Sequence, residues 1–278
     1  MHNDTADVTR TTQEYYNSAD ADRFYSLVWG GEDIHIGIYH NQEDSIFDAS
    51  RRTVEKMSTL IRGHNKGATI LDIGSGYGGS ARYLAKNFGY RVNCLNLSEQ
   101  QNTRNKKLNK EQQLDDLVTV VDGSFEALPF PGTTFDIVWS GDAILHSGNK
   151  EKVIEDVYRV LKKQGEFIFT DPMQSDDCPP GVLEPVLKRI HLKSMGSFRF
   201  YRNILLNAGF EEVQIINLSE NLITHYSMVL KELEKRREEI ITSIGTEYLD
   251  RMQEGLKHWI DAGKNGYLAW GILHFRKK

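Results

Sequence analysis

The sequence has few cysteines and lacks any long hydrophobic run. Its two cysteines, Cys94 and Cys178, lie far apart and in no paired spacing, so the sequence indicates neither a disulfide framework nor a metal site. No apolar run approaches the roughly 18 residues that a membrane-spanning helix needs, and residues 1–16 are polar and acidic. We therefore expect a cytoplasmic protein with reduced thiols, no bound metal and no membrane contact.

The chain also lacks an excess of charge of one sign. Its 34 Lys and Arg residues and 39 Asp and Glu residues give a formal net charge of −5, with both signs scattered along the chain. Binding to a phosphate backbone would require a basic surface, so we expect no nucleic-acid partner. With 278 residues and 39% hydrophobic content, the chain can form one large domain, or one domain with a cap.

Hydrophobic periodicity predicts an α/β fold. Short apolar or β-branched runs alternate with helix-like stretches, which is the βαβ pattern of a parallel sheet with helices on both faces. The expected strands are residues 68–73, 91–97, 117–122, 135–140, 166–170, 211–218 and 268–275. The expected helices are residues 80–88, 98–110, 150–161 and 197–208, followed by a long charged helical region at 222–262.

Two helical regions are expected outside the sheet. Residues 1–66, with amphipathic stretches at 9–16 and 48–62, are predicted to form an N-terminal helical cap. Residues 67–278 are predicted to form one compact unit, with a helical lid inserted at about 219–264, before the last strand. The cap and the lid are candidates for closing over a site.

The strongest local signal is a glycine-rich loop at residues 71–79, LDIGSGYGG. A strand is expected to end at this loop and a helix to follow it, so Gly74, Gly76 and Gly78 would let the backbone pass close to a ligand. The GxGxG spacing differs from the dinucleotide-binding pattern GxGxxG, although the longer pattern can also be traced here. Asp72 would repel a pyrophosphate but suits an ammonium group, which favours a methionine-like ligand over a nicotinamide dinucleotide.

From residue 68 to the C-terminus, this order of segments resembles the class I S-adenosylmethionine-dependent methyltransferases. The resemblance implies a Rossmann-like fold with a mostly parallel seven-stranded sheet, S-adenosyl-L-methionine as cofactor and S-adenosyl-L-homocysteine as product. It also implies these cofactor-binding residues: Asp72, Gly74, Gly76, Gly78, Asn96, Leu97, Gln101, Ser124, Phe125 and Ser140. Asn96 departs from the acidic ribose-binding residue common in the family, so we expect Gln101 to assist it. Phe125 fits an adenine contact and a core position equally well.

A second set of segments narrows the resemblance. Residues 29–39 (WGGEDIHIGIY), with DPM at 171–173, MGS at 195–197 and HYS at 225–227, closely resemble the sarcosine/dimethylglycine N-methyltransferases. That resemblance implies methylation of a small-molecule amine towards glycine betaine, a compatible solute. We expect a monomer or a homodimer. A phosphoethanolamine or other small-molecule methyltransferase is the alternative enzyme, and a non-catalytic S-adenosylmethionine-binding protein is the alternative of another class.

Catalytic residues are expected at the end of the fourth strand. His146 is the candidate acceptor of the amine proton, directly or through water, and Asp142 its orienter or a partner for the ammonium group. Alternatively, His146 is structural and the amine loses its proton to solvent. Aromatic faces attract methylated ammonium groups and guanidinium groups bind carboxylates. The expected substrate-binding residues are accordingly Tyr25, Trp29, Arg199, Tyr201, Arg202, His225 and Tyr226.

Overall fold

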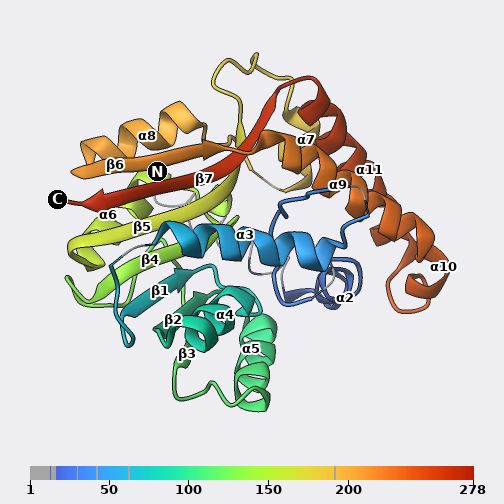
Figure 1. Cartoon of the computed structure of the whole chain (residues 1–278). Helices are drawn as coiled ribbons and strands as arrows, with labels where there is room; N and C mark the ends of the chain where they lie inside the picture. The colour runs from blue at the N-terminus through green and yellow to red at the C-terminus, as the bar shows by residue number, and fades with distance from the viewer. Residues whose placement is uncertain (1–12, 14–16, 30, 42, 62, 191) are drawn as a thin grey trace.

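The computed structural model describes the whole chain except residues 1–12, 14–16, 30, 42, 62 and 191, and its centre is a seven-stranded sheet in the order β3-β2-β1-β4-β5-β7-β6 (Figure 1). Its strands are β1 (Thr69–Ile73), β2 (Arg91–Asn96), β3 (Val118–Asp122), β4 (Phe135–Gly141), β5 (Leu161–Gln174), β6 (Phe210–Asn217) and β7 (Leu268–Lys277). Strands β1 to β5 pair in parallel, whereas β7 runs antiparallel to both β5 and β6. The predicted mostly parallel sheet is confirmed.

Helices cover both faces of this sheet. On one face, α3 (Ile46–Leu60) and α4 (Gly79–Phe88) share a hydrophobic cluster with Ile70 of β1. On the other face, α6 (Lys150–Val160) and α8 (Phe198–Asn207) share a cluster with Leu71. Successive residues of a strand point to opposite faces, so the neighbours Ile70 and Leu71 belong to different clusters.

A third hydrophobic cluster joins helices that are far apart in the sequence. It unites α2 (Ala19–Val28) with α7 (Glu184–Arg189), α9 (Ser219–Lys235), α10 (Arg237–Ile240) and α11 (Thr246–Lys264). In Figure 1 these helices gather beside one end of the sheet. The helical region predicted at 222–262 is thus three helices, and Gly245 directly precedes the last of them. Glycine is a poor helix former, and this break was not predicted.

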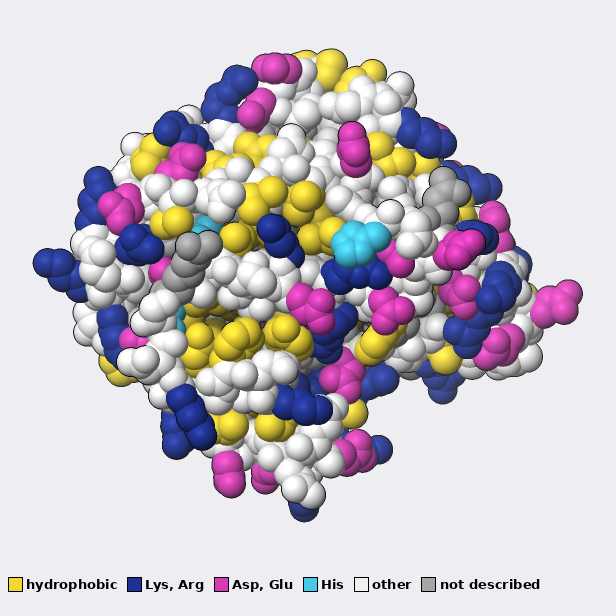
Figure 2. Space-filling model, in the orientation of Figure 1, with side chains coloured by type: hydrophobic (Ala, Val, Ile, Leu, Met, Phe, Trp, Pro, Cys, Tyr) yellow, Lys and Arg dark blue, Asp and Glu magenta, His cyan; other side chains and the backbone are white. Residues whose placement is uncertain are grey.

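The predicted cap and lid meet in this third cluster. The predicted helix at 48–62 corresponds to α3, whereas the one at 9–16 lies, apart from Gln13, outside the described residues. The division of the chain at residues 66 and 67 stays a prediction. Among the described helices, none is long and apolar enough to cross a membrane. On the face drawn in Figure 2, basic and acidic side chains are intermixed.

Candidate active site

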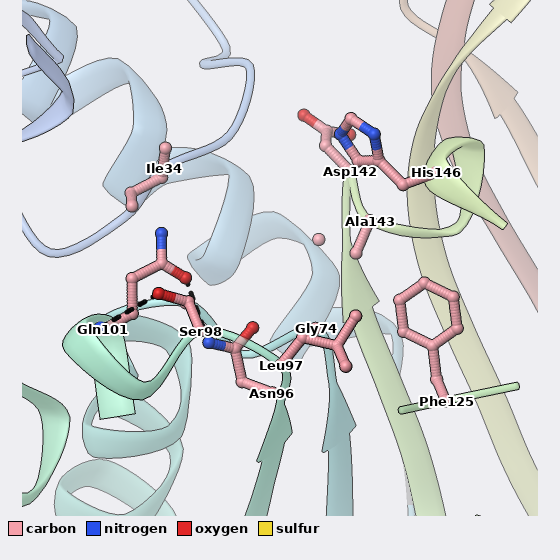
Figure 3. A pocket seen from close by; sticks show the side chains of 12 residues that line it. Ile34, Gly74, Asn96, Leu97, Ser98, Gln101, Phe125, Asp142, Ala143 and His146 are labelled. Atoms are coloured by element: carbon pink, nitrogen blue, oxygen red, sulfur yellow. Dashed lines mark hydrogen bonds between the residues drawn. The ribbon is translucent and has the colours of Figure 1, made fainter. Parts of the chain in front are cut away.

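A pocket lies at the carboxyl ends of the parallel strands, where the sheet order reverses between β1 and β4. Ligand sites of open α/β sheets occur at such switch points. The empty space between its walls, together with the open solvent at its mouth, is about 600 Å³. The lining residues are Ile34, Gly74, Gly76, Asn96, Leu97, Ser98, Gln101, Phe125, Gly141, Asp142, Ala143 and His146 (Figure 3).

Three glycines shape the loop beneath the pocket, and two of them, Gly74 and Gly76, line it. Gly74, Gly76 and Gly78 have φ values of 75°, 52° and 75°, in the left-handed region that favours glycine. A Cβ on Gly74 would overlap the Cβ of Ala143, and a Cβ on Gly78 would overlap the amide of Asn105. A Cβ on Gly76 would meet a pocket-lining side chain only at 3.7 Å. Gly74 and Gly78 therefore permit close packing beneath the loop, whereas Gly76 leaves open space inside the pocket.

A polar wall follows β2, at the N-terminus of α5 (Glu99–Glu111). Asn96 Nδ2 donates to Gln101 Oε1 at 3.0 Å, and Ser98 Oγ caps the helix by accepting from the Gln101 backbone N–H at 3.3 Å. Figure 3 shows the other polar atoms of this pair, the Asn96 oxygen and the Gln101 side-chain nitrogen, directed into the pocket. The predicted pair therefore lies together and offers one acceptor and one donor.

The remaining predicted cofactor residues divide into two groups. Leu97 and Phe125 line the pocket, but Asp72, Gly78, Ser124 and Ser140 are not among its lining residues. Ser140 is fully buried and donates its hydroxyl to Ile73 O at 2.9 Å. The Ser124 hydroxyl accepts from the Glu126 backbone N–H at 3.1 Å, within its own turn.

Asp72 is a buried carboxylate at the end of β1, with 2% of its surface exposed. Burial, and secondly the negative charge of Asp33, raise the pKa of Asp72 to about 8. Asp33 pairs with Arg51 at 2.8 Å, but Asp72 forms no ion pair with any other residue in the described part of the chain. A cation bound nearby would offset this charge.

Asp142 ties distant segments to the end of β4. Its Oδ2 accepts from the Ile36 backbone N–H at 2.7 Å, and its Oδ1 accepts from Trp270 Nε1 at 2.8 Å. Burial raises the pKa of Asp142, and the nearby His35 opposes this effect. Both carboxylate oxygens thus accept hydrogen bonds from segments that are remote in the sequence, and the orientation of His146 by Asp142 stays a prediction. These bonds have no local signal in the sequence, because Ile36 and Trp270 lie in remote segments.

His146 lines the pocket from the 3-10 turn η1 (Ile144–His146), directly after β4. Burial, and secondly the charge of Lys150, lower the pKa of His146 to about 4. The imidazole is therefore neutral near pH 7. A neutral imidazole can accept a hydrogen bond, but one with so low a pKa is a weak base.

Four of the predicted substrate-binding residues form one aromatic cluster. The Trp29 ring centroid lies 5.2 Å from that of Tyr25, 5.1 Å from His225 and 6.2 Å from Tyr226. All four side chains are buried, in the cluster that joins α2 to α9 and α11. Burial lowers the pKa of His225 to about 3. The structure therefore brings these residues together, although none of them lines the pocket described above.

The other three predicted substrate-binding residues lie elsewhere on α8. Arg199 pairs with Asp177 at 3.3 Å, and its side chain is 61% exposed. Arg202 pairs with Glu212 at 2.6 Å, and its side chain is 52% exposed. Tyr201 lies on the buried side of the same helix and is fully enclosed. The structure brings none of the three to the pocket lining.

Comparisons with known proteins identify relatives over nearly the whole chain. Residues 71–169 match the methyltransferase domain family. The chain is 54% identical to the sarcosine/dimethylglycine N-methyltransferase of Aphanothece halophytica, over 97% of this chain and 98% of the relative. It is 52% identical to the enzyme of the same name from Halorhodospira halochloris, over 96% of each. A solved structure from Galdieria sulphuraria, a candidate sarcosine dimethylglycine methyltransferase, has a TM-score of 0.89 and 41% identity, covering 95% of this chain and 99% of that one.

Proposed function

Because the chain belongs to the sarcosine/dimethylglycine N-methyltransferase family, we propose that it methylates the nitrogen of sarcosine, dimethylglycine or both, towards glycine betaine. The observation that carries the proposal is the identity of 54% over almost the full length of a relative with that activity in its name. The position of the pocket at the switch point of the sheet supports it.

When bound, S-adenosylmethionine supplies a methyl group attached to a positively charged sulfur. The residues of the pocket fit this cofactor. Gly76 leaves space for it, and the amides of Asn96 and Gln101 suit hydroxyl groups, which both donate and accept hydrogen bonds. Phe125 offers an apolar face, and we assign the buried carboxylate of Asp72 to the cofactor's ammonium group. Gly74 and Gly78 act through the packing of the loop.

The amine must reach the site with a free lone pair. An aliphatic ammonium group has a pKa of about 10, comparable to lysine, whereas the pKa of His146 is about 4. Moving the proton directly to His146 would therefore cost roughly 8 kcal/mol. We infer that the amine loses its proton to solvent before the site closes. Neutral His146 then orients the amine of sarcosine by accepting its remaining N–H, directly or through water. Dimethylglycine has no N–H once it is deprotonated, so for that substrate the other groups of the site must orient the amine.

We assign Asp142 to stabilising the positive charge that develops on the amine nitrogen, rather than to accepting the amine proton. Methyl transfer moves a positive charge onto the amine nitrogen, and Asp142 places a carboxylate in the wall of the pocket. Because its oxygens are held by Ile36 and Trp270, this charge is fixed before the reaction begins. The same two bonds tie the cap segment and β7 to the carboxyl end of β4.

We propose that the aromatic cluster receives the methylated amine and its carboxylate. Rings such as Trp29 and Tyr226 attract methylated ammonium groups by about 0.5–2 kcal/mol per contact. His225 Nδ1 accepts from the Gly37 N–H at 3.2 Å, so the proton of the neutral ring is on Nε2. This Nε2 is buried and has no hydrogen-bond partner among the described residues. We assign it to the substrate carboxylate, in place of Arg199 and Arg202.

A phosphorylated amine fits this site less well. A phosphate group favours clustered basic side chains, and the described residues that line the pocket include no lysine or arginine. We propose a small-molecule amine as the only partner of the enzyme, acted on by a monomer or a homodimer. We also place the enzyme in the cytoplasm, where a reducing environment suits its two free cysteines.

The proposal is tested with labelled S-adenosylmethionine and a panel of amines. Glycine, sarcosine, dimethylglycine, phosphoethanolamine and ethanolamine are each incubated with the protein, and every product is identified by mass. We expect labelled dimethylglycine from sarcosine, glycine betaine from dimethylglycine, or both. Transfer to phosphoethanolamine alone would contradict the substrate assignment. Cofactor binding without transfer to any amine would contradict the activity itself.

A further inference from the structure

A buried carboxylate lies directly beneath the turn that carries His146. Asp171 of β5 is fully buried, and its Oδ1 accepts from the Leu145 backbone N–H at 2.9 Å. Its Oδ2 accepts from the hydroxyl of Tyr201, on α8, at 2.6 Å. A continuous set of hydrogen bonds therefore connects α8 through β5 to the residue that precedes His146.

The outer side of the same turn is held by two other charged groups. Lys150 Nζ donates to the carbonyl oxygens of Leu145 and Ser147, at 3.1 and 3.0 Å. Glu126 Oε1 accepts from the Ser147 hydroxyl and from the Gly148 N–H, both at 2.7 Å. The backbone on both sides of His146 is thus fixed from the interior and from the surface.

Burying the Asp171 carboxyl group is energetically unfavourable, and hydrophobic packing around it does not explain why it is there. Burial raises the pKa of Asp171 to about 7, which means that its charged form is disfavoured in this core. The Tyr201 ring packs against Phe169 at 5.2 Å and Phe200 at 5.5 Å, surroundings that would accept a phenylalanine equally well. The Tyr201 hydroxyl, which phenylalanine lacks, donates to Asp171. We therefore attribute this polar pair to support of the turn rather than to packing of the core.

Three segments singled out in the sequence meet at this pair. Asp171 begins the DPM segment, and Tyr201 was predicted to bind substrate. Gly196, in the MGS segment, lies so close to the Tyr201 ring that a Cβ there would overlap it. The residue before Asp171, Thr170, accepts from the Asp142 backbone N–H at 3.0 Å, so the same stretch of β5 also supports Asp142.

We propose that Asp171 and Tyr201 are positioning residues for methyl transfer, which hold the turn at residues 142–146 so that His146 faces the acceptor side of the pocket. Neither residue lines the pocket, so both act through the turn. The role in methyl transfer rests on the proposed function, whereas the control of the position of His146 does not.

The experiment compares two single-hydroxyl deletions in the same hydrophobic cluster. Tyr201→Phe removes the hydroxyl that binds Asp171. Tyr158→Phe is the matched control, because its ring packs against Phe210 at 5.1 Å, away from the turn. We expect Tyr201→Phe to lower kcat roughly 10- to 100-fold, the scale of small misplacements in active sites, with the dissociation constant of S-adenosylmethionine unchanged. The control should keep both values.

A second readout reports on the turn itself. The NMR signals of the His146 ring, assigned with a His146→Gln variant, should shift in Tyr201→Phe and in Asp171→Asn but not in Tyr158→Phe. If the Tyr201→Phe signals and kcat match those of the control, the proposal is overturned. If the unsubstituted protein methylates no amine, the proposed function fails, and the His146 signals still decide whether Asp171 and Tyr201 hold the turn.

Discussion

Gly74 faces Ala143 across the floor of the pocket so closely that a Cβ on Gly74 would overlap the Cβ of Ala143. The loop after β1 and the loop after β4 can therefore pack in contact only because Gly74 has no side chain. We predict that Gly74→Ala lowers the free energy of unfolding by about 2–4 kcal/mol, from overpacking and from its left-handed backbone. Urea denaturation measures this loss, and calorimetry should show weakened binding of S-adenosylmethionine.

Gly76→Ala provides the comparison for this variant. Its backbone is also left-handed, but its Cβ would lie 3.7 Å from Ile34, an ordinary contact distance. We expect a loss of stability of only about 1 kcal/mol, with weaker cofactor binding because the new methyl group occupies the pocket. Equal losses of stability in the two variants would contradict the packing argument.

Asp142 should control the closure of the cap segment. Asp142→Ala would leave the Ile36 N–H and the Trp270 indole N–H without their acceptors, at a cost of about 1–3 kcal/mol for each group that stays buried. We predict faster hydrogen exchange at the Ile36 amide, measured by NMR. Asp136→Ala is the control, since Asp136 accepts from the Thr69 backbone N–H at the opposite end of the sheet. Unchanged exchange at Ile36 in Asp142→Ala would show that the cap is held by other contacts.

His225 should determine the preference for a carboxylate. His225→Ala removes the Nε2–H donor, so we expect KM for dimethylglycine to rise roughly 10- to 100-fold while the affinity for S-adenosylmethionine is kept. KM for dimethylaminoethanol, which lacks the carboxylate, should rise much less in this variant. His258→Ala, on α11, serves as the control. A uniform loss for both amines would indicate a structural role for His225.

Cofactor binding should depend on pH through Asp72. Its pKa is raised to about 8, so near pH 7 the carboxyl group is mostly protonated, and pairing with a cation requires loss of that proton. We predict that affinity for S-adenosylmethionine increases from pH 6 to pH 7.5, and that calorimetry in buffers of different ionisation enthalpy detects proton release. Asp72→Asn should abolish both effects. Binding without proton release in the unsubstituted protein would refute the assignment.

The same raised pKa affects stability in the absence of cofactor. In the folded protein Asp72 favours its protonated form, whereas in the unfolded chain its pKa is near the ordinary value of 3.8. This contribution to the free energy of unfolding is present in full below about pH 4 and is lost as the pH rises towards 8. Urea denaturation of Asp72→Asn should therefore show a weaker loss of stability over this interval than the unsubstituted protein.

The positions of the strands along the chain and the glycine loop were predictable because they depend on local hydrophobic period and on turn chemistry. β5 was predicted only at 166–170 but spans Leu161–Gln174. Its last residues pair antiparallel with β7, from Asp171 opposite Gly271 to Gln174 opposite Leu268, and a pairing with so distant a segment has no local signal. The bonds of Asp142 could not be predicted for the same reason.

The positions of the residues on α8 illustrate another limit. Arg199 and Arg202 were expected at the substrate, but they are three residues apart and share one face of the helix, while Tyr201 points into the core. Which face turns inward depends on packing against β5 and β6. Arginine suits a carboxylate ligand, but only the fold decides which side chains can reach it.

β7 has a consequence for synthesis of the protein. It follows all other strands in the sequence yet lies between β5 and β6, and it carries Trp270, which binds Asp142. During translation, β6 therefore emerges from the ribosome before its neighbour in the sheet exists. The nascent chain cannot complete the site until β7 has been released, so a ribosome that stalls before residue 268 leaves an exposed sheet edge for chaperones to protect.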